Sequence, residues 1–471
     1  MIDTGFGYMA TADGTTPWRA GTADRIITPD ESMWMAGFGG RDKPSEGVHQ
    51  DLQAKAIVLE DDRGTRVAIV SLEILFVGRS LRQAVVERCK DAYDLDPSHI
   101  LLNASHTHQG PVTRTSTVEE TDENGETKLV PKQDGSVNFI PIEKYQLESK
   151  YREQTVRYGE FLEDTVVGLV GEAIEGLAPA ELEYGKGHCG SAMSRRRPYE
   201  DGIAFRPYSF GPKDHEVPVL AVSDPNAEGG EAIRALLFGY ACHTTVQFLY
   251  EFSGDWAGYT QRMLEHRFPN ATAIFLMGCG GDQKAYPQRE QRFTEGHAQG
   301  VALAVEGALE SVLYPVRGPL TAVYEEIGIP FEGPPSDEEI QALCESDDPT
   351  EQWRGNHLQQ VREREGEIPT RYPYAMQTIG FGTDLTMLAL AGEVLAGYST
   401  RLKEELDGHV WVSGYSNNAF TYVPTRRAIA EGGYEGERII GHTTLPGKWE
   451  PDLEERIVEA SHALVDRVRT P

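Results

Sequence analysis

The stretch ILLNASHTHQGP, residues 100–111, decides the interpretation of the whole chain. The run HILLNAS (99–105), which overlaps it, is short and nearly continuously apolar, as is typical of a β-strand buried on both faces. His106 and His108 follow where that strand should end. In an extended chain, residues i and i+2 point to the same side, so we expect both imidazoles to face one cleft. The pair fits a fragment of a zinc site, and it equally fits two solvated loop histidines.

Three further apolar strands are predicted to end in polar side chains. His243 follows the strand in YACHTTVQ (240–247), and Glu393 ends LTMLALAGE (385–393). The strand HVWVSGYS (409–416) leads into NNAFTYVPT (417–425), which offers Tyr422 or an Asn. Open α/β sheets bind ligands beyond their strand ends. An unpaired buried carboxylate is costly, so Glu393 either belongs to such a site or pairs with an arginine. Together, the four strand ends predict one shared site.

Two other segments carry candidate binding groups. The Gly-rich turn LMGCGGDQKAYP (276–287) lacks the spacing of a P-loop or a dinucleotide-binding loop. Its glycines are therefore expected to let the backbone approach a ligand closely. The cluster SRRRP (194–198) supplies Arg195, Arg196 and Arg197, of which one could bind a substrate oxygen or carboxylate. The alternative is that all three pair with the acidic surface.

Strands and helices alternate over most of the chain, which predicts an α/β fold: a single large domain with a mixed β-sheet and flanking helices. We place this domain at residues 21–471, after an N-terminal extension at 1–20. Two polar segments, at about 113–150 and 334–370, are interpreted as inserts. The predicted helices span residues 79–93, about 153–177, 257–268, 289–314, 394–406 and about 451–467.

The composition and charge of the chain exclude several classes of function. The chain has 471 residues, of which 39% are hydrophobic, and its 44 Lys and Arg against 74 Asp and Glu give a formal charge of −30. Such a charge repels nucleic acid and anionic lipid. No apolar run is long enough to span a bilayer, and the N-terminus does not resemble a secretory signal. We expect a cytoplasmic protein with a small-molecule substrate, no nucleic acid, no membrane anchor, and at most further copies of itself as partners.

These motifs together resemble the catalytic domain of the neutral/alkaline non-lysosomal ceramidases. The similarity runs from about residue 20 to 467, and its most specific parts are the opening segments and the His-Thr-His-Gln-Gly-Pro motif. The resembling segments are RIITP (25–29), MAGFGGR (35–41), GVHQDLQAKAIVLED (47–61), VSLEI (70–74), SHTHQGP (105–111), SRRRP (194–198), YACHTT (240–245), GCGGDQ (278–283), LAGEV (390–394) and SGYSNNAFTYVPTRR (413–427).

The resemblance implies a catalytic site built around one Zn²⁺ per chain. It places His108 at the substrate carbonyl, Arg195 in the wall of the site, and Asp282 among the catalytic residues. Spacing alone does not select Tyr422 as a ligand; the resemblance does. The four metal ligands that it implies are His106, His243, Glu393 and Tyr422.

The chain departs from the family pattern in three places. Family ceramidases carry a Ser two positions after the Gly-Asp pair, whereas Gln283 and Lys284 follow Asp282 here. Glu73 stands where an Asp is usual. We also expect no C-terminal immunoglobulin-like domain, because the chain ends where ceramidases continue into one. These departures fall in substrate-handling parts, so ceramide is a less secure expectation than zinc hydrolysis.

The sequence therefore predicts a zinc-dependent hydrolase that cleaves an amide (N-acyl) bond and is not specific for ceramide. Attack by metal-activated water would need no Ser nucleophile. Two alternatives stay open. The first is zinc-dependent hydrolysis of an ester, lactone or glycoside of a polar or sugar-like substrate. The second is a non-catalytic binding protein that retains the fold.

Overall fold

The computed structural model describes residues 18–469 except 114–116, 122–126, 132–148 and 444. Its main feature is a nine-stranded mixed sheet with the order β14-β12-β11-β8-β1-β3-β4-β5, and β16 added beside β8. Neighbouring strands are antiparallel except at the two ends, where β12 pairs with β14 and β4 pairs with β5 in parallel. The strands are β1 (Trp18–Ile26), β3 (Gln53–Glu60), β4 (Arg66–Leu72), β5 (Ile100–Ala104), β8 (Ala178–His188), β11 (Glu216–Ser223), β12 (Ile233–Tyr240), β14 (Thr272–Met277) and β16 (Tyr314–Pro315).

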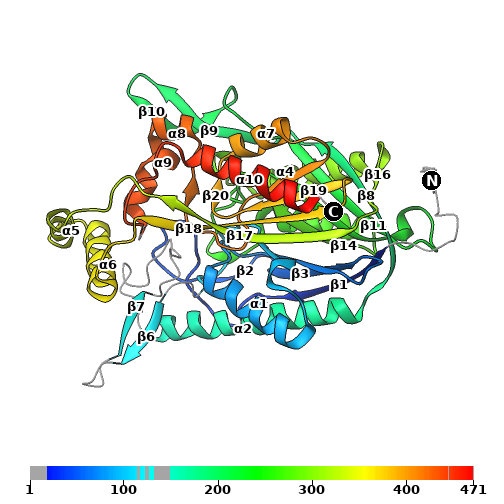
Figure 1. Ribbon diagram of the computed structural model, residues 1–471, viewed down its shortest axis with the longest axis horizontal. Helices are drawn as coiled ribbons and strands as arrows, with labels where there is room; N and C mark the ends of the chain where they lie inside the picture. The colour runs from blue at the N-terminus through cyan, green and yellow to red at the C-terminus, as the bar shows by residue number, and fades with distance from the viewer. Residues whose placement is uncertain (1–17, 114–116, 122–126, 132–148, 444, 470–471) are drawn as a thin grey trace.

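A second, four-stranded sheet has the order β17-β18-β19-β21 and lies across one face of the first sheet (Figure 1). Smaller sheets surround the strand ends. The second sheet contains β17 (Leu320–Pro330), β18 (Arg371–Phe381), β19 (Leu385–Leu390) and β21 (Val410–Ser413). The smaller sheets pair β9 (Ala192–Tyr199) with β10 (Gly202–Tyr208) and β15 (Gln283–Ala285), β20 (Glu393–Val394) with β22 (Tyr422–Val423), β2 (Gly47–Val48) with β13 (Glu251–Phe252), and β6 (Thr117–Thr121) with β7 (Thr127–Pro131).

The layers run helix, sheet, sheet, helix, as Figure 1 shows. Strand alternation explains this order: Ile57 and Leu59 of β3 pack between the sheets with Met387 and Trp411, whereas the intervening positions of β3 face the helices. The outer face of the large sheet is covered by α1 (Arg79–Tyr93), α2 (Ser149–Glu175), α3 (Asp255–Arg267) and α4 (Gln291–Glu310). The outer face of the second sheet is covered by α7 (Ala396–Glu405) and α10 (Leu453–Arg469).

One buried side chain, Asn103 in β5, links three strand ends. Its Oδ1 accepts the backbone N–H of Met277 at 2.7 Å, and its Nδ2 donates to the carbonyl of Gly414 at 2.8 Å and to Oγ of Ser416 at 3.1 Å. The two outermost strands of the large sheet, β5 and β14, are thereby joined to the segment that follows β21. This junction lies directly before the first histidine of the predicted site.

The predicted fold class is confirmed: the chain is a mixed α/β protein with flanking helices. The predicted helix at 79–93 coincides with α1. The strands β8, β9, β17 and β18 were not predicted. β1 begins at Trp18, inside the predicted extension, whose first 17 residues lie outside the described chain.

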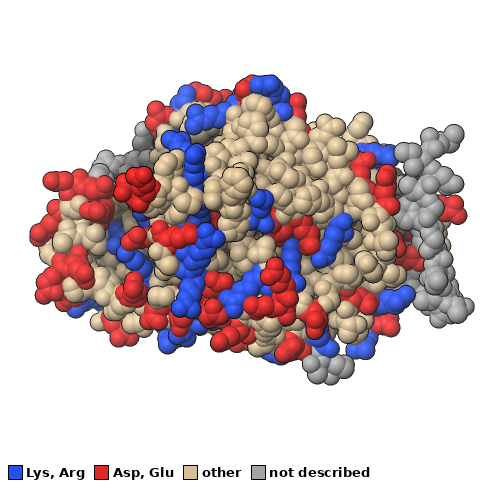
Figure 2. All heavy atoms as spheres, turned by 90° about the horizontal axis from the view of Figure 1, so that it is seen from above, with Lys and Arg blue, Asp and Glu red and all other residues tan. Residues whose placement is uncertain are grey.

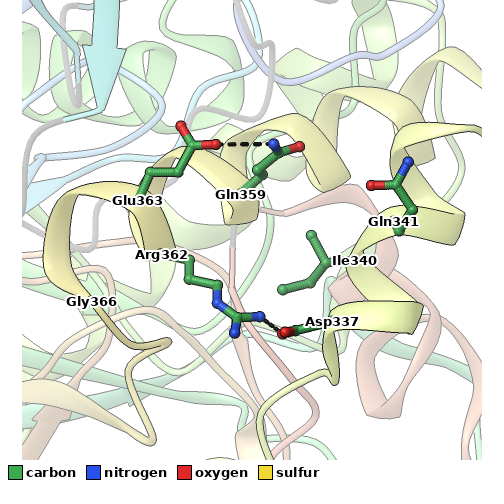
Figure 3. Close-up of a pocket in the computed structure, with 7 residues that line it drawn as sticks. All are labelled: Asp337, Ile340, Gln341, Gln359, Arg362, Glu363 and Gly366. Carbon is green, nitrogen blue, oxygen red and sulfur yellow. Dashed lines mark hydrogen bonds and ion pairs between the residues drawn. The ribbon is translucent and has the colours of Figure 1, made fainter.

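The two predicted inserts differ in how much of them can be described. Most of 113–150 lies outside the described residues, apart from the β6-β7 pair. The 334–370 segment forms α5 (Asp337–Cys344) and α6 (Pro349–Glu365), and acidic side chains gather at this end of the molecule (Figure 2). A pocket between α5 and α6, crossed by an ion pair between Arg362 and Asp337, is lined only by residues of this insert (Figure 3).

Among the helices that the structure describes, none combines the length and the apolar character needed to cross a membrane.

Candidate metal centre

Four buried side chains from four strand ends meet in the structure: His106 after β5, His243 after β12, Glu393 in β20 and Tyr422 in β22. Nε2 of each histidine lies 3.2 Å from Oε2 of Glu393. The Tyr422 hydroxyl lies 3.3 Å from Nε2 of His243. Glu393 and Tyr422 are paired residues of the short parallel sheet β20-β22, so their side chains lie on the same face.

Backbone carbonyls orient both imidazoles. Nδ1 of His106 lies 3.1 Å from the Leu75 carbonyl, and Nδ1 of His243 lies 2.8 Å from the Gly280 carbonyl. A carbonyl only accepts, so each Nδ1 carries the proton and each Nε2 turns a lone pair toward Glu393. Burial and the Arg195 charge lower the pKa of His243 to about 3, which keeps this ring neutral.

The cluster therefore gathers atoms that accept protons or bind cations. Glu393 is buried, and its Oε2 faces Nε2 of both histidines. Two atoms held about 2.0–2.1 Å from one ion at a tetrahedral angle lie about 3.3 Å apart. The separations of 3.2, 3.2 and 3.3 Å match that spacing. Imidazole and oxygen ligands in such a set fit Zn²⁺.

His108 also lies at this cluster, but through a backbone conformation that the sequence did not predict. The extended conformation does not continue past β5, because His106 adopts a left-handed backbone with φ of 61°. The two rings still meet, with centroids 4.8 Å apart and planes nearly perpendicular, and their Nε2 atoms are 3.2 Å apart. His106, His108 and His243 thus also form a three-histidine group whose nitrogens lie within 4.8 Å of one another.

His108 is less buried than the other two histidines and is held from behind by the segment around Gly37. Gly37 has φ of 95°, and a Cβ there would lie 2.4 Å from Cγ of His108, so only glycine fits. The Phe38 ring packs against the imidazole at 4.7 Å. Burial, followed by the charges of the neighbouring histidines, Lys284 and Arg41, holds the pKa of His108 well below its ordinary value.

Of the three clustered arginines, Arg195 lies at the site. Its guanidinium donates to the Tyr422 hydroxyl at 2.8 Å, to the Gly281 carbonyl at 2.7 Å and to Glu435 at 2.8 Å. Arg196 is also buried and donates to the second oxygen of Glu435, whereas Arg197 is exposed. A buried triad, Arg195-Glu435-Arg196, therefore holds the Tyr422 hydroxyl in place.

Asp282 lies beside the cluster and binds a helix end. Its carboxylate accepts the backbone N–H of Ala396, at the start of α7, at 2.9 Å. Burial raises its pKa to about 6. The preceding residue, Gly281, lets the backbone pass close to β20, because a Cβ on Gly281 would lie 2.5 Å from the Glu393 carbonyl. The sequence pattern predicted instead that this glycine-rich turn approaches a ligand.

The structure places the side chains of two departures from the family pattern, Gln283-Lys284 and Glu73. Gln283 is buried, accepts the N–H of Asp214 at 2.8 Å and donates to the Ala241 carbonyl. Glu73 accepts the N–H of Gln53 at 2.9 Å and the Gln261 side chain at 2.7 Å, so it joins β3 to α3. Lys284 is half-buried, and burial together with the charge of Arg195 lowers its pKa to about 8.

Sequence reasoning did not single out Tyr415 and Glu435. Tyr415, at φ of 52°, packs its ring 4.5 Å from that of His106, and its hydroxyl lies 3.4 Å from Glu393. A signal for Tyr415 existed, since it directly follows a buried strand, as the predicted ligands do. Glu435 lies in α9 (Gly433–Gly436), within a glycine-rich segment whose sequence gave no sign of burial.

The chain is similar in sequence to known proteins. Residues 20–121 match the family described as neutral/alkaline non-lysosomal ceramidase, N-terminal. The neutral ceramidase of Pseudomonas aeruginosa is 23% identical over 96% of this chain and 73% of its own length. The neutral ceramidase of Drosophila pseudoobscura pseudoobscura is 30% identical over 107 residues, which cover 22% of this chain and only 15% of that protein.

The fold is also shared with solved structures. The crystal structure of neutral ceramidase from Pseudomonas aeruginosa superposes with a TM-score of 0.69 at 20% identity, covering 97% of this chain and 76% of that chain. A ceramidase described as complexed with C2 superposes with a TM-score of 0.70 over the same shares. The resemblance inferred from the motifs is confirmed.

Proposed function

From this kinship with the neutral ceramidases, we propose that the chain is a metal-dependent hydrolase that cleaves an amide bond, with one Zn²⁺ held by His106, His243, Glu393 and Tyr422. The observation that carries the proposal is the convergence of two imidazole lone pairs on one buried carboxyl group. Such an arrangement is costly without a cation between its members. The family resemblance supplies the reaction class.

The bound ion would supply a Lewis acid that polarises a carbonyl and lowers the pKa of water. Side chains of the protein supply the other contributions to the reaction. His108 is the least buried of the three histidines, so it can hydrogen-bond a substrate oxygen and pass a proton to the leaving amine. Arg195 holds the Tyr422 hydroxyl at 2.8 Å and acts as a positioning residue. Asp282 secures the start of α7, close behind Glu393.

The substrate is proposed to be an N-acyl compound other than a typical ceramide. Gln283 is committed to backbone groups of Asp214 and Ala241, and Lys284 brings a cation to the position where family ceramidases have Ser. A hydrated ammonium group is unfavourable for the apolar part of a long-chain lipid. Related folds often keep their chemistry while they change substrate.

The test combines metal analysis with a substrate panel. Elemental analysis of protein purified without chelator should give about one zinc per chain. N-acyl amides should be hydrolysed, activity should disappear with chelator, and zinc should restore it. Aryl esters, lactones and aryl glycosides are assayed in parallel. Zinc well below one per chain would refute the metal, zinc-dependent turnover only of the other bonds would refute amide cleavage, and no turnover at all would favour a binding protein.

A further inference from the structure

We infer that Lys284 is an anion-binding residue of the substrate site, so that the preferred N-acyl substrate carries a carboxylate or another anionic group near the scissile amide. This inference rests on the proposed function and goes further, because it names the substrate class. Its evidence is the position of Lys284 beside His243 and the absence, among the described residues, of an acidic side chain that forms an ion pair with it.

Strand pairing directs the Lys284 side chain toward the metal centre. Lys284 forms a parallel bridge with His243, and in β15 it is paired with Met193 of β9. Paired residues of neighbouring strands carry their side chains on the same face. The flanking Gln283 and Ala285 are buried on the opposite face, whereas Lys284 is half-buried. The ammonium group therefore lies on the His243 side of the strand.

Within the part of the chain that the structure describes, no protein carboxylate forms an ion pair with this cation, although the charge of the buried Asp255 acts on it. There, Nζ of Lys284 has no hydrogen-bond acceptor and no ion pair within 4.0 Å, although the chain has 74 acidic residues against 44 basic ones. Other shielded lysines are paired: Lys55 contacts Glu265, and Lys403 contacts Asp214 at 2.8 Å. Partial burial of an unpaired ammonium group costs free energy unless a bound anion interacts with it.

The surroundings of Lys284 favour an anion. The charges of Arg195 and Arg289 act to lower the pKa of Lys284, and the buried Asp255 acts in the opposite direction. Lys284 and Arg41 both act on His108. Arg41 is itself buried, and its Nη atoms donate to the carbonyls of Ala36 and Leu249. The group proposed to contact the scissile carbonyl is thus flanked by positive charge. An anionic substituent placed there would meet Lys284 within reach of a charge-assisted hydrogen bond.

The experiment uses substrates that differ in a single charge. N-dodecanoylglycine carries a carboxylate where N-dodecanoylglycinamide carries a neutral amide, and N-dodecanoylethylenediamine carries a cation. Dodecanoate release is measured for each with the zinc-loaded full-length protein, and kcat/KM is compared. Binding is measured separately, by calorimetry, with N-(dodecylsulfonyl)glycine and its carboxamide, because the sulfonamide group resists hydrolysis.

We expect the wild-type protein to prefer the anionic member of each pair by roughly 10- to 100-fold, the range of a hydrogen bond to a charged group. Lys284→Gln should abolish that preference, and Lys284→Glu should shift it toward the ethylenediamine compound. Lys213→Gln is the matched control, because Lys213 is half-buried, as Lys284 is, and its Nζ donates to the Ser209 carbonyl. It removes the same charge from the whole protein and should keep the preference.

The outcomes separate this inference from the proposed function. Equal kcat/KM for the charged and neutral amides, or a preference that Lys284→Gln leaves unchanged, would overturn the anion site while amide hydrolysis stands. Absence of all turnover, combined with Lys284-dependent binding of the sulfonylglycine, would refute the hydrolase and support the anion site. Absence of both would refute both.

Discussion

Replacement of Asn103 by Ala tests the junction that links β5, β14 and the segment after β21. Truncation removes the acceptor for the Met277 N–H and the donor to Gly414 and Ser416, all in a fully buried position. Ser416 keeps its own hydrogen bond to the Gly414 carbonyl, so that carbonyl is not left alone. The Met277 N–H is left without its side-chain partner.

The size of the destabilisation follows from the hydrogen bonds that the substitution removes. One buried donor left unpaired costs about 1–3 kcal/mol, and two further lost hydrogen bonds cost about 1 kcal/mol each. We expect the free energy of unfolding to fall by roughly 3–5 kcal/mol, a large part of the total stability of a typical domain. Because His106 follows β5 directly, zinc affinity should also fall.

The assay is urea unfolding followed by tryptophan fluorescence, performed with chelator so that metal binding does not contribute. Asn226→Ala is the control, because the Asn226 side chain is exposed and hydrogen-bonds to Asp224 within its own turn. Its effect should stay within about 0.5 kcal/mol. A loss below about 1 kcal/mol for Asn103→Ala would show that this carboxamide does not hold the strand ends together.

Further predictions concern the site itself. His106→Ala or His243→Ala should each abolish bound zinc and activity in a folded protein, and unchanged zinc by elemental analysis would remove them from the ligand set. His108→Ala should keep zinc and slow turnover roughly 10²–10³-fold; loss of zinc instead would favour the three-histidine group as the ligand set. Burial raises the pKa of Asp282 to about 6, so the stability that its protonated form contributes is present below about pH 4 and is lost as the pH rises through 6. Asp282→Asn should therefore flatten this decline in urea midpoints, and an unaltered pH profile would contradict the assignment. Long-chain ceramide in mixed micelles should be a poor substrate relative to N-dodecanoylglycine, and robust zinc-dependent release of its fatty acid would show that Lys284 does not exclude it.

The sequence predicted the fold class and the strand ends well because both depend on apolar runs. Buried strands such as β5 and β19 are continuous hydrophobic segments, and the polar residue after each one marks the site. The strand β17 was missed because its exposed positions carry Glu325 and Glu326, which break the apolar pattern.

Other features depend on tertiary structure and leave no local signal. The left-handed backbone of His106 is imposed by its surroundings, because this conformation is unfavourable for a histidine in isolation. The partner of Arg195 lies 240 positions along the chain, in a short helix. No periodicity could connect Arg195 with Glu435, since their pairing exists only once both sheets have assembled.

The proposed ligands come from both sheets: His106 and His243 follow strands of the large sheet, whereas Glu393 follows β19 of the second. An ion bound there would join the two layers, and it could bind tightly only to the native chain. At a free ion concentration 100 times the Kd, such linkage stabilises the native state by about 2.7 kcal/mol and reduces the unfolded population about a hundredfold. Proteases act largely on opened chains. The zinc supply of the cell would thus govern the lifetime of this protein as well as its chemistry.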